Sequence, residues 1–186
     1  MSDARDNGIT ELVTDHREVE EMFARFDKSV PGSKERKRIA DEFTIELVRH
    51  SVAEEEHLYP AVRRHVPGGD ALADREIKDH AEVEKILKRI EQLPPDAETF
   101  DELVATLQAE VSEHVRDEEN NLFPCLRESC NDQELLDLGD KIRSAKKTAP
   151  TRPHPHAPST PPGNKLLAPG TGLVDRVRDH LTGRGR

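Results

Sequence analysis

Two stretches of the sequence share the pattern His-x-x-x-Glu-Glu-x-x-Leu-aromatic-Pro, one beginning at His50 and the other at His114, 64 residues later. The same offset relates the six residues Asp-His-Arg-Glu-Val-Glu around His16 to the similar stretch around His80. Such self-similarity indicates a duplicated helical hairpin. Imidazole and carboxylate groups are common metal ligands, so each copy could supply two histidines and one glutamate to a shared metal centre.

The spacing within each motif places a histidine and a glutamate one turn apart on the same face of a helix. The six candidate metal ligands are His16, His50, Glu54, His80, His114 and Glu118. All of them fall within apolar helical stripes, and a buried polar group without a partner costs roughly 2–7 kcal/mol. Hydrogen bonds among the six residues would not satisfy them all, because four imidazole rings would have to share two carboxylates. We therefore predict that cations are their common partner.

The donor set also suggests how many ions bind and which metal they are. Two carboxylates, one from each repeat, can bridge two ions while two histidines bind each ion. A bridging solvent oxygen would make each ion five-coordinate and leave space for an added ligand. Nitrogen and carboxylate donors without thiolate favour iron, with manganese second, over a closed structural zinc site. We expect two iron ions.

Four amphipathic segments must position these residues, because apolar side chains recur in them every three or four positions. The segments cover approximately residues 9–28, 33–64, 71–92 and 100–128. Thr99 and Glu102 have the spacing of a capping box at the start of the fourth segment. We predict an all-α fold, an up-down-up-down four-helix bundle with its core in residues 9–128. An extra helix at about 132–146 is expected on its outside.

The sequence predicts a helical domain over residues 1–147 and a proline-rich linker or tail over residues 148–186. Proline blocks helix continuation, so residues 148–172 are expected to be extended and solvated. His154 and His156 are expected to be solvated there rather than to bind metal. A short terminal helix of two to three turns fits residues 173–181. The sequence identifies no protein partner for this tail.

Composition limits the other classes of partner. The formal net charge of −10 argues against nucleic acid and anionic membranes, which are held chiefly by surplus Lys and Arg. No apolar run approaches the roughly 18–20 residues that span a bilayer, and the polar start lacks a signal-peptide pattern. We expect a cytoplasmic protein. Cys125 and Cys130 are too few for a disulfide framework and are expected to be ordinary helix-end residues.

The spacing of the six ligands on four helices resembles that of the hemerythrin HHE cation-binding family, over about residues 9–128. The resemblance implies a non-haem di-iron centre bridged by Glu54, Glu118 and an oxo or hydroxo group. It implies binding of and reaction with O2 or hydrogen peroxide, such as catalase-like peroxide decomposition in oxidative-stress defence. The alternative is a non-enzymatic module that senses O2 or NO, or that binds iron or oxygen. Whether the chain is an enzyme stays open.

Two positions depart from the repeat or from the family. Glu76 stands where oxygen-carrying hemerythrins have a fifth histidine, and its counterpart in the first repeat is Leu12. It is either a third carboxylate ligand, which would favour redox chemistry over reversible oxygen carriage, or a solvent-exposed residue. Tyr59 is matched by Phe123. It either turns toward the metals as a phenolate ligand or a proton and electron donor, or packs over the site as an aromatic.

Several acidic residues lie next to candidate ligands in the sequence. Asp15 and Asp79 each precede a ligand histidine and are either hydrogen-bond partners of metal-bound imidazoles or solvated. Glu55, Glu56 and Glu119 are expected on the charged outer face.

Overall fold

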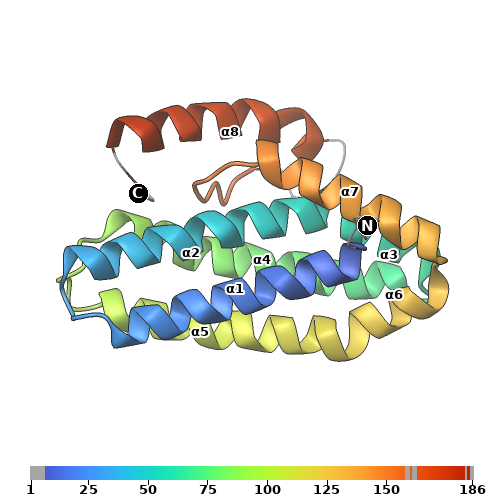
Figure 1. Cartoon of the computed structure of the whole chain (residues 1–186), viewed down its shortest axis with the longest axis horizontal. Helices are drawn as coiled ribbons and strands as arrows, with labels where there is room; N and C mark the ends of the chain where they lie inside the picture. Colours follow the sequence, from blue (N-terminus) through green and yellow to red (C-terminus); the bar gives the residue numbers. More distant parts are fainter. Residues whose placement is uncertain (1–6, 158–159, 161–162, 183, 185–186) are drawn as a thin grey trace, which may run out of the picture.

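The computed structural model describes residues 7–157, 160, 163–182 and 184 (Figure 1). These residues form helices and connecting turns, which confirms the predicted all-α class. None of the helices in this part of the chain is long and apolar enough to cross a membrane. The helices in chain order are α1 (Gly8–Lys28), α2 (Lys34–Ala53), η1 (Glu54–Leu58), α3 (Tyr59–His65), α4 (Gly69–Gln92), α5 (Phe100–Asp117), η2 (Glu118–Leu122), α6 (Phe123–Ser129), α7 (Asp132–Thr148) and α8 (Gly163–Thr182).

The helices α1, α2, α4 and α5 run lengthwise and alternate in direction, as expected of an up-down-up-down bundle (Figure 1). Their buried apolar residues form two separate clusters. One contains Phe23, Phe43 and Phe100, and the other contains Leu12 and Leu122. The candidate ligands lie along each helix between the two clusters, so a polar layer divides the apolar core.

Each helix that carries a full motif contains one wide π-helical turn, η1 or η2, in place of the uninterrupted segment that we predicted. The N–H of Tyr59 donates to the carbonyl of Glu54, five residues earlier, and the N–H of Phe123 donates in the same way to Glu118. The next residue in each case is a proline. It has no N–H, and its ring would clash with the carbonyl four residues before it, so a regular α-helical turn is disfavoured. π turns are frequent at functional sites.

The predicted capping box at Thr99 is wrong. The side chain of Thr99 caps no backbone N–H, because its ψ of 0° departs from the extended conformation that a capping side chain needs. A capping box does form at the start of α7, where the side chain of Asn131 accepts from the N–H of Glu134 and the side chain of Glu134 accepts in return. This arrangement fixes where α7 begins.

The extra helix α7 packs on α1 and α2 and buries Leu135, Leu138 and Ile142. The C-terminal helix α8 has 20 residues and begins at Gly163, ten residues before the predicted start at 173. In Figure 1 it lies along the outside of the bundle, above α2 and beside the end of α7. The domain boundary after residue 147 stays a prediction.

The segment before α8 differs from the solvated tail that we expected, because Thr151 and Arg152 are buried. Their backbone N–H groups donate to Asp175 of α8, and the Arg152 guanidinium pairs with Glu91 of α4. His154 also contacts Asp175, at 2.8 Å. The acids of α8 and α4 thus supply the polar partners that water was expected to supply.

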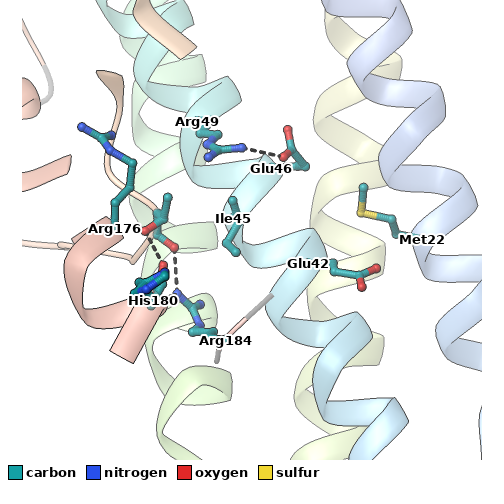
Figure 2. A pocket seen from close by; sticks show the side chains of 10 residues that line it. Met22, Glu42, Ile45, Glu46, Arg49, Arg176, His180 and Arg184 are labelled. Carbon is teal, nitrogen blue, oxygen red and sulfur yellow. Dashed lines mark hydrogen bonds and ion pairs between the residues drawn. The ribbon is translucent and has the colours of Figure 1, made fainter. Parts of the chain in front are cut away.

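A cleft of about 500 Å³ remains between α8 and the face formed by α1 and α2 (Figure 2). Met22 and Ile45 line it on the bundle side, and Arg176 lies on the α8 side. Arg49 pairs within the cleft with Glu46, at 3.0 Å. Acids and arginines alternate on its walls, so the cleft has no strong charge of one sign.

Candidate metal centre

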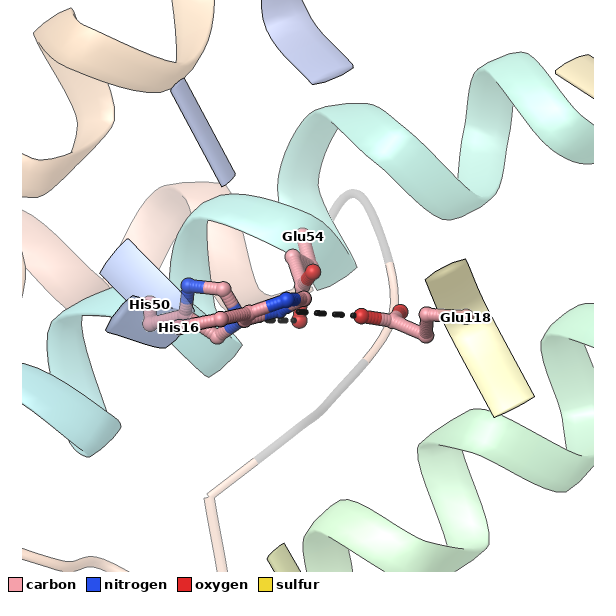
Figure 3. A group of neighbouring side chains, drawn as sticks. All are labelled: His16, His50, Glu54 and Glu118. Atoms are coloured by element: carbon pink, nitrogen blue, oxygen red, sulfur yellow. Dashed lines mark ion pairs between the residues drawn. The ribbon is translucent and has the colours of Figure 1, made fainter. Parts of the chain in front are cut away.

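The structure brings the six predicted ligands together from six elements at mid-bundle, and each is at most 8% exposed. Figure 3 shows His16 and His50 beside each other, with both rings directed at Glu54 and Glu118. The four Nε2–carboxylate distances are 3.4 Å for His16 to Glu118, 3.2 Å for His50 to Glu54, 3.2 Å for His80 to Glu54 and 3.6 Å for His114 to Glu118.

The donor atoms fall into overlapping groups in which all atoms lie within 4.8 Å of one another. One group contains His16 and His50 with both glutamates, and another contains His80 and His114 with Glu54. The Nε2 atoms of His80 and His114 are only 3.2 Å apart, so both point at the same small volume. This geometry fits bound cations that share the carboxylates.

Several donor atoms in this cluster are buried without a hydrogen-bond partner among the described residues, and these include His16 Nε2, Glu54 Oε1 and Glu118 Oε2. Such atoms are rare in folded proteins, because each loses its water without compensation. A cation would accept the imidazole lone pair and the carboxylate oxygens together. The residues therefore fit a metal centre of nitrogen and oxygen ligands.

A second layer of carboxylates lies at the outer edges of all four rings. The Nδ1 contacts are His16 to Glu119 at 2.8 Å, His50 to Asp15 at 3.1 Å, His80 to Glu55 at 3.1 Å and His114 to Glu76 at 2.9 Å. The first three are hydrogen bonds, and such partners fix the tautomer and the orientation of metal-binding imidazoles. In all four rings Nε2 is the atom that faces the carboxylates of the centre.

Histidines and glutamates in this layer shift each other's pKa. Burial by itself lowers the pKa of His50, but Glu54 and Asp15 outweigh that effect and raise the pKa to about 10. Burial likewise raises the pKa of Glu54, yet His50 and His80 hold it well below its usual range. Protons on His50 and His80, whose pKa values are both raised, therefore balance the carboxylates when no cation is bound, and a cation would take their place.

Comparison with known proteins identifies the family. The sequence matches the hemerythrin HHE cation binding domain over residues 7–126. The chain belongs to the hemerythrin HHE family. It is 26% identical over 171 residues to an uncharacterised hemerythrin-like protein of Schizosaccharomyces pombe, covering 91% of this chain and 84% of that protein.

Two further comparisons define how far this likeness extends. A DNA nickase of Nostoc is 30% identical over 147 residues, which cover 78% of this chain but only 41% of the nickase. A crystal structure of a hemerythrin HHE cation binding domain-containing protein from Mycobacterium kansasii superposes with a TM-score of 0.67 at 22% identity. That superposition covers 76% of this chain and 86% of the other, and it confirms the predicted fold.

The outer carboxylates of this HHE domain were only partly predicted. The expectation that Glu55, Glu56 and Glu119 lie on the charged outer face is wrong. Glu55 and Glu119 contact candidate ligand histidines of the other repeat, and Glu56 is buried. The signal for Glu55 and Glu119 in the sequence was the second Glu of each His-x-x-x-Glu-Glu motif. Asp15 contacts the candidate ligand His50. Its counterpart in the second repeat, Asp79, is partly exposed, and His114, the counterpart of His50, contacts Glu76.

Glu76 is fully buried, so its predicted alternative as a solvent-exposed residue is wrong. Its Oε2 atom lies 2.9 Å from Nδ1 of His114, out of line for a hydrogen bond, and its Oε1 atom accepts from Arg75. Glu76 thus lies at the outer edge of the His114 ring. It also comes within 4.8 Å of donor atoms of His114 and Glu118, so direct ligation by Glu76 stays a prediction.

Tyr59 is fully buried and turns into the centre of the HHE domain. Its hydroxyl oxygen lies 3.0 Å from Nε2 of His80, 3.2 Å from Glu118 and 3.4 Å from Glu54. Burial, and next the Glu54 carboxylate, raise the pKa of Tyr59 well above its usual value, so the phenol is protonated when no cation is bound. Phe123 in the other repeat stacks on His16 with ring centroids 5.8 Å apart.

A cavity of about 20 Å³ adjoins the centre on the side away from Tyr59's cluster of apolar residues. The four ligand histidines form its polar wall, and Val83, Val111 and Leu47 are among the residues that form its apolar walls. Such a volume holds about one or two heavy atoms. The cavity can therefore take a small molecule next to the rings and exclude larger ones.

Proposed function

We propose that this chain is a non-haem di-iron protein that reacts with hydrogen peroxide or O2, with catalase-like peroxide decomposition as its activity. The observation that carries the proposal is the cavity of about 20 Å³ walled by four histidines and apolar side chains. It fits a ligand of about two heavy atoms such as peroxide or O2. Bound iron would supply the electron transfers that convert two peroxide molecules into two waters and one O2.

The residues of the chain have distinct parts in this proposal. Glu54 and Glu118, with the four histidines, would hold the ions. Tyr59 has its hydroxyl 3.2 Å from Glu118, where it can give a proton to a reacting oxygen or take one back. Val83 and Val111 keep bulk water away from the cavity, which strengthens electrostatic interactions inside it.

The experiment is iron loading followed by measurement of O2 evolution from added peroxide. Sustained turnover is expected in the native chain and is expected to disappear in Glu54→Ala. The exposed Glu113 on α5 offers a matched control, since Glu113→Ala removes a carboxylate without touching the centre. Tyr59→Phe is expected to retain iron and to lose about 10²–10⁴-fold in turnover if the phenol transfers protons.

The second candidate is a non-enzymatic module that senses O2 or NO or stores iron or oxygen. The small, largely enclosed cavity favours it, because such a cavity suits a diatomic ligand that stays bound. A stable adduct with no O2 evolution would select this function over the enzyme. For both candidate functions the proposed partners are small molecules, and the proposed location is the cytoplasm. A net charge of −10 disfavours binding to DNA.

A further inference from the structure

Three potential metal ligands meet at one end of the bundle, outside the centre described above. They are His65, the last residue of α3, Cys130, which caps the end of α6, and Glu134, in the first turn of α7. One donor atom from each lies within 4.8 Å of the other two. In Figure 1 the ends of α3 and α6 and the start of α7 lie together at the same end of the molecule.

Two of these residues break the internal repeat. The position equivalent to His65 in the second copy is Ser129, and the position equivalent to Cys130 in the first copy is Val66. The duplicated hairpin therefore does not by itself account for an imidazole beside a thiol. Cys130 is partly buried, whereas Cys125, five residues earlier, is exposed.

We propose that His65, Cys130 and Glu134 form a second metal site, which takes a divalent ion of the zinc class through one imidazole, one thiolate and one carboxylate. Nitrogen, sulfur and oxygen donors of this kind are those that zinc prefers. A tetrahedral site with the usual zinc bond lengths places donor atoms about 3.3–3.8 Å apart. Since the donor atoms lie within 4.8 Å of one another, the three side chains need to approach by at most about 1.5 Å, which side-chain rotation can supply.

Glu134 is partly oriented before any ion binds. Its Oε2 atom accepts from the N–H of Asn131 at 2.9 Å in the capping box, which leaves Oε1 for the ion. Three protein ligands leave the fourth position of a tetrahedral ion to water. The ion would join the ends of α3, α6 and α7, and so would hold the short helix that begins at Tyr59, about 9 Å away along its axis.

The thiolate distinguishes this site from the buried centre, which has only nitrogen and oxygen donors. The test is a Co²⁺ titration of the full chain with its buried centre already loaded with iron. Thiolate bound to Co²⁺ gives a charge-transfer absorption in the near ultraviolet, and we expect one such band that saturates at one equivalent. Cys130→Ser is expected to abolish the band, and His65→Ala is expected to weaken Co²⁺ binding by at least about tenfold.

Cys125→Ser is the matched control, because it removes the other thiol of the same helix and is expected to leave the band unchanged. Helical content and iron loading of Cys130→Ser show whether the variant is folded. The absence of a band in the native chain, or its loss in Cys125→Ser and not in Cys130→Ser, would overturn the proposal. The outcome is independent of the proposed function, since failure of iron to bind leaves the thiolate band readable.

Discussion

In the contact between Nδ1 of His16 and Glu119, a histidine of the first repeat meets a carboxylate of the second. In the contact between His80 and Glu55, a histidine of the second repeat meets a carboxylate of the first. Each motif thus contributes one carboxylate to the centre and the next carboxylate to a histidine of the other repeat. This exchange explains why two consecutive glutamates occur in both copies. It also makes the orientation of the rings dependent on the pairing of the two halves.

Glu119→Gln tests this dependence, because the amide keeps the size of the side chain but removes its charge. We expect metal affinity to fall about 10–100-fold, as is typical when a partner of a ligand histidine is lost. Competition with a chelator of known affinity measures the change. Glu113→Gln, on an exposed position of α5, is expected to have no effect. Equal affinities for the two variants would contradict the orienting role.

Protonation of His50 gives a pH dependence with a defined sign. Its pKa is raised to about 10 in the fold without cations, from about 6.5 in an unfolded chain. The charged ring therefore stabilises the metal-free fold fully below pH 6.5, and this contribution is lost as the pH rises through 10. Urea unfolding of metal-free protein should show stability falling across that window. The slope should be shallower in His50→Gln, and an unchanged slope would refute the assignment.

At the scale of elements, the sequence predicted the four long segments and the position of each candidate ligand on them. It could do so because apolar residues and ligands share one helical period. It did not predict the π turns, since that period assumes a regular helix throughout. Nor could spacing along one helix settle Glu76 and Tyr59, because their partners His114 and Glu118 belong to other elements.

The course of the chain after α7 was missed for a related reason. Its proline content is typical of solvated segments, but Asp175, which accepts the N–H groups of Thr151 and Arg152, lies more than 20 residues later, on α8. Docking of α8 depends on a close approach at Gly172. A Cβ atom there would meet the carbonyl oxygens of Thr148 at 2.2 Å and Ala149 at 2.8 Å.

Gly172→Ala is therefore expected to displace α8 from the end of α7. Gly170→Ala is the matched control, because a Cβ atom at that position meets nothing within 4 Å. Amide hydrogen exchange should show lost protection at Thr151 and Arg152 in Gly172→Ala only. Unchanged protection in both variants would mean that α8 is not held by this contact.

At the scale of the whole molecule, a polar layer lies between two apolar clusters, so the bundle has no continuous hydrophobic core at its middle. Bound cations would form coordinate bonds with the buried donor atoms of that layer that have no hydrogen-bond partner. The metal centre should therefore contribute to stability as well as to chemistry. The two halves of the molecule are joined through it.

Removal of metal tests this contribution. Metal present at about 100 times its dissociation constant stabilises a fold by about 2.7 kcal/mol. For a chain of this size that corresponds to a difference in Tm of about 5–11 °C. Calorimetry before and after treatment with a chelator measures it, and re-addition of metal should restore the original Tm. A chelated protein with unchanged Tm would show that the layer is stable without cations.

The π turns also have a consequence for the orientation of Tyr59. The one extra residue in η1 rotates every side chain that follows it by about 100° about the helix axis, which is the rotation per residue of an α-helix. Deleting Glu56 would restore an ordinary repeat but would swing the phenol away from His80. Because of this rotation, histidines before the π turn and an aromatic ring after it both point toward the bundle axis.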